Sequence, residues 1–206
     1  MKGSEIIIIG AGGHAKSCID VIESEGRYQI AGIVGVESEI GSGLFGYQVI
    51  GMDDDLPQLA KSFRNALVAV GQIKSSQTRE ELFLRIESCG FEQPTIISPQ
   101  AYVSKRSTVG KGTIVMHHAL INAGARVGEN CIVNTGSIIE HDVVVGNNCH
   151  VATNSVLNGG VRLHEGCFIG SGSVVRENIE IGEKSVIGMG LVVRHDLTAC
   201  SNFVGS

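Results

Sequence analysis

The stretch VGENCIVNTGSIIEHDVVVGNNCHV, residues 127–151, places an aliphatic residue at every sixth position. The same spacing runs from Ile97 to Val193, where every sixth residue is Ile, Val or Leu. An α-helix cannot keep a period of six on one face, and an antiparallel meander would need turn signals that this segment lacks. A six-residue repeat is typical of a parallel β-helix. Each repeat is expected to form one flat side, with its aliphatic residue filling the interior.

Three six-residue sides close one coil, so residues in neighbouring coils that stack on each other are separated by three repeats. Cys131, Cys149 and Cys167 follow this spacing, and we expect them to lie inside the prism about 4.8 Å apart. We interpret them as small hydrophobic residues in a column, not as a metal or disulfide cluster. The glycines directly after aliphatic positions are predicted to take the backbone angles of tight corners; they are Gly110, Gly128, Gly146, Gly170, Gly182 and Gly188.

Residues 1–95 follow a different pattern, in which strand-like and helix-like stretches alternate. We expect strands over residues 6–9, 29–34 and 66–70, and helices over residues 15–24, 53–61 and 78–86. This alternation favours a small parallel sheet with covering helices. The predicted fold is therefore mixed, with a Rossmann-like α/β domain over residues 1–95 and a β-helix over residues 96–206.

The composition narrows the class of protein. The chain has 206 residues, of which 28 are Gly and 3 are Pro, and its formal net charge is -5. Scarce proline excludes collagen, and the charge lacks the basic excess of a nucleic-acid or acidic-membrane binder. No segment approaches the ~20 apolar residues of a membrane span, and the first residues lack a signal-peptide pattern. We therefore expect a cytoplasmic protein with reduced cysteines that acts on small molecules.

Two segments, together with the six-residue repeat, resemble a known family. They are Ile9-Gly-Ala-Gly-Gly-His-Ala-Lys16 and Val133-Asn-Thr-Gly-Ser-Ile-Ile-Glu-His-Asp-Val-Val-Val-Gly146. The chain resembles the sugar acyltransferases of the sialic acid O-acetyltransferase family, and within it the N-acetyltransferases of bacillosamine, perosamine and legionaminic acid synthesis. The resemblance implies a left-handed β-helix, a rare exception to right-handed crossovers. It also implies a homotrimer with acetyl-CoA bound between neighbouring prisms.

Acetyl transfer from a thioester to an amine needs a base and a donor that stabilises the oxyanion. Histidine is the natural base near neutral pH, and His141 lies between two carboxylates that can fix its tautomer. By resemblance, His141 is the catalytic base and Asp142 supports it. Asn134, which opens an Asn-Thr pair after an aliphatic position, is predicted to orient the site.

The resemblance also implies contacts with the substrates. His150 is expected to contact the thioester of acetyl-CoA and to suit the role of oxyanion donor. Further acetyl-CoA contacts are expected along the groove at Gly159, Ser171 and Met189, made mainly by the backbone. The sugar nucleotide is expected at Gly12, Gly13, His14 and Gly71.

The glycine loop also satisfies a dinucleotide fingerprint, because Gly10, Gly12 and Ala15 follow a strand. However, the domain is half the size of a dinucleotide fold, and Gly35-Val36 stand where an acidic residue should end the second strand. We therefore favour a sugar nucleotide over NAD. The uridine-binding members of the family commonly have an aspartate pair at Gly35-Val36, so GDP, another nucleotide or an unactivated sugar stays open.

The leading hypothesis is an acetyl-CoA-dependent N-acetyltransferase acting on a UDP- or GDP-linked 4-amino-sugar, with no metal required. One alternative keeps the enzyme class but makes the acceptor the hydroxyl of a sialic-acid-like sugar. A second is a zinc hydratase on the same scaffold, in which the pair His117-His118 would hold the metal. A third is a non-catalytic assembly scaffold.

Overall fold

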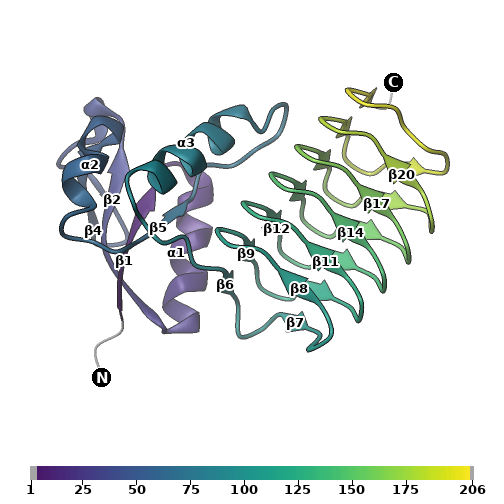
Figure 1. Cartoon of the computed structure of the whole chain (residues 1–206), viewed down its shortest axis with the longest axis horizontal. Coiled ribbons are helices and arrows are strands. Elements are labelled where there is room, and N and C mark those ends of the chain that lie inside the picture. Colours follow the sequence, from purple (N-terminus) through teal and green to yellow (C-terminus); the bar gives the residue numbers. More distant parts are fainter. Residues whose placement is uncertain (1–3, 205–206) are drawn as a thin grey trace.

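The computed structural model describes residues 4–204, which form an α/β unit followed by a prism of stacked coils (Figure 1). The α/β sheet contains β1 (Ser4–Ile9), β2 (Tyr28–Gly35), β3 (Gly43–Leu44), β4 (Tyr47–Met52) and β5 (Asn65–Val68), in the order β3-β4-β2-β1-β5. All neighbours pair in parallel except β3 and β4. The three predicted strands are confirmed, and the β3–β4 hairpin is an addition that the sequence did not indicate.

Helices cover both faces of this sheet. Helix α1 (Gly13–Glu25) lies between the sheet and the coils, where its apolar side chains pack with Ile114 and Ile132 of the prism (Figure 1). The opposite face is covered by α2 (Leu56–Leu59), which follows the 3-10 turns η1 (Glu37–Glu39) and η2 (Asp53–Asp55), and by α3 (Gln77–Ser88). The apolar stripe of α1 is therefore buried on both sides, which joins the two units into one body.

The prism has three faces, which we call the first, second and third in chain order. The first face contains β6 (Ile96–Ile97), β9 (Ile114–Val115), β12 (Ile132–Val133), β15 (His150–Val151), β18 (Phe168–Ile169), β21 (Val186–Ile187) and β23 (Asn202–Phe203). The second face contains β7 (Tyr102–Val103), β10 (Leu120–Ile121), β13 (Ile138–Ile139), β16 (Val156–Leu157), β19 (Val174–Val175) and β22 (Val192–Val193). The third face contains β8 (Thr108–Val109), β11 (Arg126–Val127), β14 (Val144–Val145), β17 (Arg162–Leu163) and β20 (Glu180–Ile181).

The register of the coils agrees with the repeat. Ile132 pairs with Ile114 on one side and with His150 on the other, so each strand stacks on the strand 18 residues away. The repeating aliphatic residues fill the interior, and the thiols of Cys131, Cys149 and Cys167 are buried and free. The predicted cysteine column is therefore confirmed.

The prediction for the corner glycines is wrong. None of the six glycines directly after an aliphatic position has a positive φ. From Val109 to Ile187, the left-handed backbone instead recurs three residues after each aliphatic position, at Gly112, His118, Gly124, Asn130, Gly136, Asp142, Asn148, Asn154, Gly160, Gly166, Gly172, Asn178, Lys184 and Gly190. A Cβ on Gly110 would lie 2.7 Å from the backbone of Gly128 in the next coil. That glycine is required for close stacking of coils, because no side chain fits between them.

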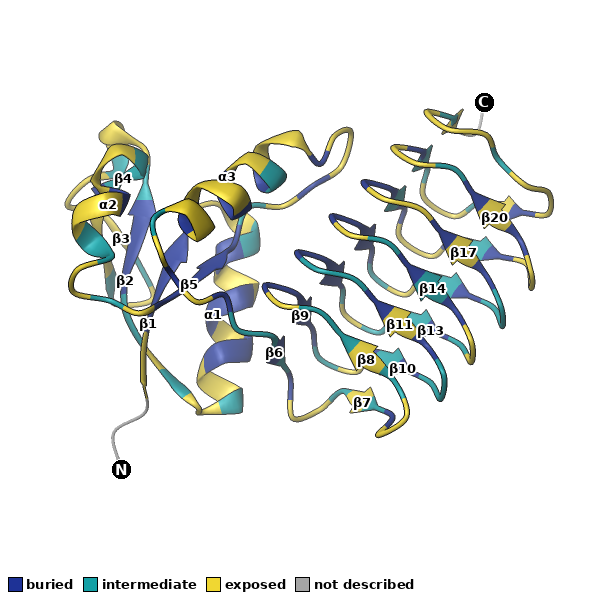
Figure 2. Ribbon diagram, in the orientation of Figure 1, coloured by how far each residue is buried: buried dark blue, intermediate teal, exposed yellow. Residues whose placement is uncertain are grey.

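The outward side chains differ from face to face. On the first face, Ile96, Ile114 and Ile132 are fully buried under the α/β unit, and that cover ends beyond His150. On the second face, every outward residue is apolar: Tyr102, Leu120, Ile138, Val156, Val174 and Val192. On the third face, the outward residues are Thr108, Arg126, Val144, Arg162 and Glu180, and four of the five are exposed (Figure 2). Within residues 4–204, no helix is long and apolar enough to cross a bilayer.

Candidate active site

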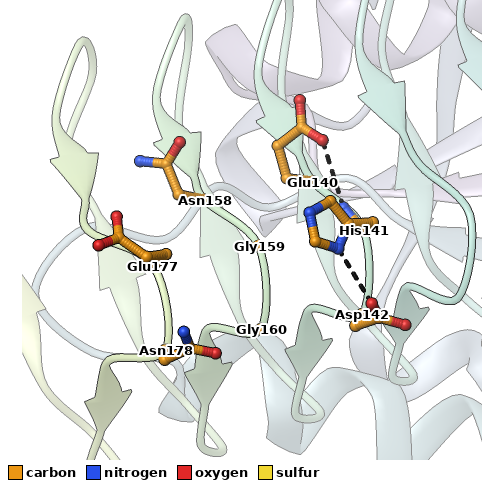
Figure 3. A pocket seen from close by; sticks show the side chains of 8 residues that line it. All are labelled: Glu140, His141, Asp142, Asn158, Gly159, Gly160, Glu177 and Asn178. Carbon is orange, nitrogen blue, oxygen red and sulfur yellow. Dashed lines mark hydrogen bonds and ion pairs between the residues drawn. The ribbon is translucent and has the colours of Figure 1, made fainter.

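His141 lies at the edge between the second and third faces, in the turn that joins β13 to β14. Its Nδ1 is 2.9 Å from Oδ2 of Asp142, which occupies the left-handed position of the turn with φ 62° (Figure 3). A carboxylate only accepts hydrogen bonds, so Nδ1 is the nitrogen that carries the proton in the neutral form of the ring. The lone pair is then on Nε2, the nitrogen that a base must leave free.

An open cavity of about 450 Å³ surrounds this imidazole. A Cβ on Gly159 would lie 2.6 Å from Nε2 of His141, so a side chain at this position would displace the ring from the place it takes here. Glu140 is held by Nδ2 of Asn122 at 2.7 Å. The polar side chains across the cavity from His141 are Asn158, Glu177 and Asn178 (Figure 3). The site therefore combines a free imidazole nitrogen with hydrogen-bonding groups.

His150 is in a different environment, because it faces outward from β15 under the α/β unit and is only 7% exposed. Its Nδ1 donates to the carbonyl oxygen of Gln72 at 2.7 Å, and its Nε2 accepts from Nδ2 of Asn134 at 3.1 Å. Burial lowers the pKa of His150 to about 4, and the nearby positive charge of Arg79 acts in the same direction. The ring is therefore neutral and uses both nitrogens within the protein.

The glycine loop lies where α/β sheets bind ligands. Strand β1 is flanked by β2 and β5, so the chain changes direction there and the carboxyl ends of the strands form a crevice. A Cβ on Gly12 or Gly13 would meet nothing within 4 Å, and Gly71 packs against His14. Burial lowers the pKa of His14 to about 3, with smaller effects of Arg79 and His150, and its Nε2 is buried without a partner.

The acidic residue that the sequence lacked at the end of β2 comes from further along the chain. A Cβ on Gly35 would lie 2.6 Å from Oε2 of Glu39, the carboxylate oxygen that accepts from the amide of Val36 at 3.0 Å. Gly35 therefore makes room for the Glu39 carboxylate beside Ala11 of the glycine loop.

Arg79 of α3 holds the loop after β5 in place. Its guanidinium is 1% exposed and donates to the carbonyls of Val68 at 2.7 Å, Val70 at 3.0 Å and Asn130 at 3.2 Å. Burial lowers the pKa of Arg79 to about 10, which leaves it charged near neutral pH. This side chain ties the crevice of the α/β unit to the edge of the prism.

Ser171 and Met189 lie at the edge between the first and second faces, and both line a cavity of about 730 Å³. Phe168 and Val186 form apolar walls of this cavity, while Lys74 and Lys184 supply positive charge. These groups fit a long, partly apolar molecule with phosphate groups, which is the chemistry of CoA.

One chain does not bring all the predicted site residues together. His141, Asp142 and Gly159 lie at one edge of the second face, whereas Asn134, Ser171 and Met189 lie at its other edge. His14, Gly71 and His150 lie beside the second group, at the junction of the two units. The predicted catalytic and binding residues therefore form two half-sites.

The pair His117-His118, considered as zinc ligands, has structural roles instead. His117 lies 2.7 Å from Oδ2 of Asp20 through Nε2 and 2.6 Å from Oγ of Ser98 through Nδ1, and His118 occupies a left-handed turn position. Within the described residues, no three His, Cys, Asp or Glu side chains are placed to hold a metal ion.

Several residues at these sites escaped the sequence-based prediction. Glu177 stacks two coils from His141, so the spacing alone could have placed it in the cavity. Gln72 and Arg79 gave no such signal, because their partners are 78 and 51 residues away in the chain.

Comparisons with known proteins agree with this architecture. Residues 5–86 match the PglD N-terminal domain, and residues 124–159 and 160–195 match the bacterial transferase hexapeptide repeats. PerB, the perosamine N-acetyltransferase of Caulobacter crescentus, solved with CoA and GDP-perosamine, is 33% identical and superimposes with a TM-score of 0.90, covering 98% of this chain and 94% of that one. No curated protein sequence matches the chain significantly.

Two further structures are similar. The acetyltransferase domain of PglB from Neisseria gonorrhoeae, solved with acetyl coenzyme A, is 28% identical with a TM-score of 0.86, covering 95% of this chain and 93% of that one. WeeI from Acinetobacter baumannii is 19% identical with a TM-score of 0.74, covering 96% of this chain and 95% of that one, and supports the fold alone.

Fold and repeats define an acyltransferase with an N-terminal α/β domain and a left-handed β-helix, as the sequence predicted. The chain belongs to the nucleotide-sugar acetyltransferases that combine a PglD-type N-terminal domain with hexapeptide repeats. This membership supports neither the zinc hydratase nor the non-catalytic scaffold.

Proposed function

We propose that this chain transfers the acetyl group of acetyl-CoA to the amine of a nucleotide-linked 4-amino-sugar, with UDP or GDP as the nucleotide. The observation that carries the proposal is the His141–Asp142 pair, which leaves Nε2 free in an open cavity. GDP-perosamine and CoA bound to PerB, and acetyl coenzyme A bound to the PglB domain, support the two substrates. The product would serve glycan biosynthesis, and we expect the reaction to occur in the cytoplasm.

His141 would act as the general base. The neutral amine attacks the acetyl carbonyl, and Nε2 of His141 takes the proton that the amine loses. As the carbon–sulfur bond breaks, the proton passes to the departing thiolate, which leaves as the thiol of CoA. Asp142 holds Nδ1–H and stabilises the positive charge that the imidazole gains in between.

We assign the oxyanion donor to Asn134, with His150 as the residue that positions it. Nε2 of His150 accepts a hydrogen bond and so has no proton to donate to a carbonyl oxygen. Nδ2 of Asn134 gives one hydrogen to His150, while Oδ1 accepts from the amide of Thr135 at 2.8 Å. The second hydrogen of the Asn134 amide is then available to the substrate.

The two half-sites would meet between neighbouring copies of the chain. The second face presents only apolar side chains between the two edges that carry His141 and Asn134. Three copies packed through this face around one axis would bring the His141 edge of each against the Asn134 edge of the next. We therefore propose a homotrimer with three shared active sites.

A mixing experiment tests both the residues and the sharing. His141→Ala and Asn134→Ala should each release CoA at least about 10²-fold more slowly than the unaltered enzyme. When the two variants are unfolded together and refolded, about a quarter of the sites should contain both native residues and recover activity. If both residues act within one chain, no mixture recovers, and the shared site is wrong.

The same assay identifies the acceptor. Amino-sugar nucleotides carrying UDP, GDP and dTDP are compared with the corresponding hydroxyl sugars and with free sialic acid. Faster CoA release with the amines supports N-acetylation. Preference for sialic acid would instead make the chain an O-acetyltransferase.

A further inference from the structure

The main-chain carbonyl of Gln72 decides which nitrogen of His150 carries the proton. The rings of His14 and Phe168 lie beside His150, with ring centroids 6.5 Å and 5.2 Å away, and restrict the plane of the imidazole. Packing alone does not distinguish the two nitrogens, because both tautomers of the ring have the same shape. The carbonyl oxygen of Gln72 is 2.7 Å from Nδ1 and accepts a hydrogen bond, so the proton is on Nδ1. Nε2 is left to accept from Asn134.

The side chain of Gln72 holds this carbonyl against the prism. Gln72 is 3% exposed, and its Nε2 lies 3.4 Å from the carbonyl oxygens of Gly166 and Cys167. The carbonyl of Cys167 also accepts from the main-chain amide of His150 at 2.9 Å. Gln72 therefore contacts His150 directly through its main chain, and through its side chain it contacts a carbonyl to which His150 is itself bonded.

The loop that contains Gln72 is fixed on its other side by the α/β unit. Gly71 packs against His14, and the carbonyl of Val70 accepts from Arg79 at 3.0 Å. The loop therefore connects the crevice of the α/β unit with the prism. It cannot slide along the prism without losing these contacts, so loss of the Gln72 amide should tilt the carbonyl of this residue rather than unfold the loop.

The amide of Gln72 adds little to the stability of the fold. Within residues 4–204, Oε1 of Gln72 is buried without a hydrogen-bond partner. A buried polar atom that lacks a partner costs stability, so an apolar side chain of the same shape would be neutral or stabilising at this position. The buried amide therefore serves the orientation of the loop more than the stability of the protein.

We infer that Gln72 is a positioning residue for acetyl transfer: it fixes the tautomer of His150 and, through that ring, the direction of the Asn134 amide. This inference rests on the proposed function for the role of Asn134 as the oxyanion donor. If Nε2 of His150 carried the proton instead, it would face a hydrogen of the Asn134 amide, and two donors form no hydrogen bond. The amide would then turn, and its free hydrogen would no longer point to the substrate.

The variant Gln72→Met removes the amide and keeps the length of the side chain. We expect kcat to fall about 5- to 30-fold, because a misplaced oxyanion donor weakens the stabilisation of the transition state without abolishing it. The KM values for acetyl-CoA and for the nucleotide sugar should stay within about 2-fold. The midpoint of urea unfolding should not decrease. Nitrogen NMR of His150 should show one tautomer, protonated on Nδ1, in the unaltered enzyme and a mixture of tautomers in the variant.

A double variant separates positioning from a structural role. In the Asn134→Ala background, Gln72→Met should cause no further loss of kcat, because the group on which Gln72 acts is already absent. The matched control Gln77→Met replaces an exposed glutamine that pairs with Glu81 on the surface of α3. This control should leave both kcat and the tautomer of His150 unchanged.

Three results overturn the inference: an unchanged kcat in Gln72→Met, an additional loss in the Asn134→Ala background, or a single tautomer of His150 in both proteins. The NMR measurement needs no acceptor. An enzyme whose tautomer changes but which acetylates no amino-sugar therefore contradicts the proposed function and still supports the link between Gln72 and His150.

Discussion

The second and third faces of the prism are built from the same repeat, yet their outward surfaces are opposite in character. On both faces, alternate residues point inward and fill the same aliphatic core. Outward, the second face presents one aromatic and five aliphatic side chains, whereas the third presents two arginines, a glutamate and a threonine around Val144. The interior therefore fixes the fold, whereas the outward residues give the two faces different chemical character. An uninterrupted apolar surface of this kind marks an interaction site.

The largest effect is expected from placing a charge in the middle of the second face. Ile138→Glu should convert the proposed trimer to monomers and reduce CoA release at least about 10²-fold, because a buried unpaired carboxylate opposes association. Sedimentation and the activity assay measure the two effects. Val144→Glu introduces the same charge at the neighbouring strand of the third face and should leave both unchanged. Equal behaviour of the two variants would show that the faces are equivalent.

The two buried histidines at the covered first face should make the stability of the protein depend on pH. His14 and His150 have folded pKa values of about 3 and about 4, both below the usual value of about 6.5. At pH values between the folded pKa values and 6.5, the unfolded chain binds more protons than the folded chain. The free energy of unfolding therefore has its full value above pH ~6.5 and falls as the pH falls. From pH 6.5 to 5, each histidine should cost about 2 kcal/mol of unfolding free energy.

Urea unfolding at pH 7 and pH 5, at one protein concentration, measures this loss. His150→Asn should retain only the part due to His14, so its two unfolding curves should lie closer together. Coincident curves for the unaltered protein would mean that water reaches both rings.

The smallest effect is expected from trimming outward side chains. Val156→Ala on the second face should weaken association by roughly 3- to 10-fold, because it exposes less apolar area to be buried. Arg162→Ala on the third face should change neither association nor stability by more than about 0.5 kcal/mol. Dissociation constants from dilution experiments distinguish the two variants, and a larger effect of Arg162→Ala would contradict the division between faces.

The sequence predicted those features of the molecule that repeat. The six-residue spacing from Ile97 to Val193 predicted the coils, and the spacing of the cysteines predicted how the coils stack. The pairing of His141 with Asp142 was also readable, since the two residues are adjacent. Other features could not be predicted from the sequence. The tautomer of His150 is set by Gln72, a residue distant in the chain, and the β3–β4 hairpin has too few residues to give a periodic signal. The prediction for the corner glycines was wrong because a glycine in the sequence can mean either a left-handed backbone or a close approach between neighbouring coils.

The first face is covered unevenly, so the two ends of the prism are expected to differ in local unfolding. Stacked repeats lose structure from an unsupported end, since each coil is held mainly by its neighbours. The coils that contain Ile114 and Ile132 pack against α1, whereas the last coils, around Val186 and Asn202, lie outside this apolar cluster. Amide protection against hydrogen exchange should therefore decline along the prism toward residue 204, with the cavity beside Lys184 in the part that opens most often. A ligand that binds in this cavity would therefore contact the coils whose structure adjusts most readily.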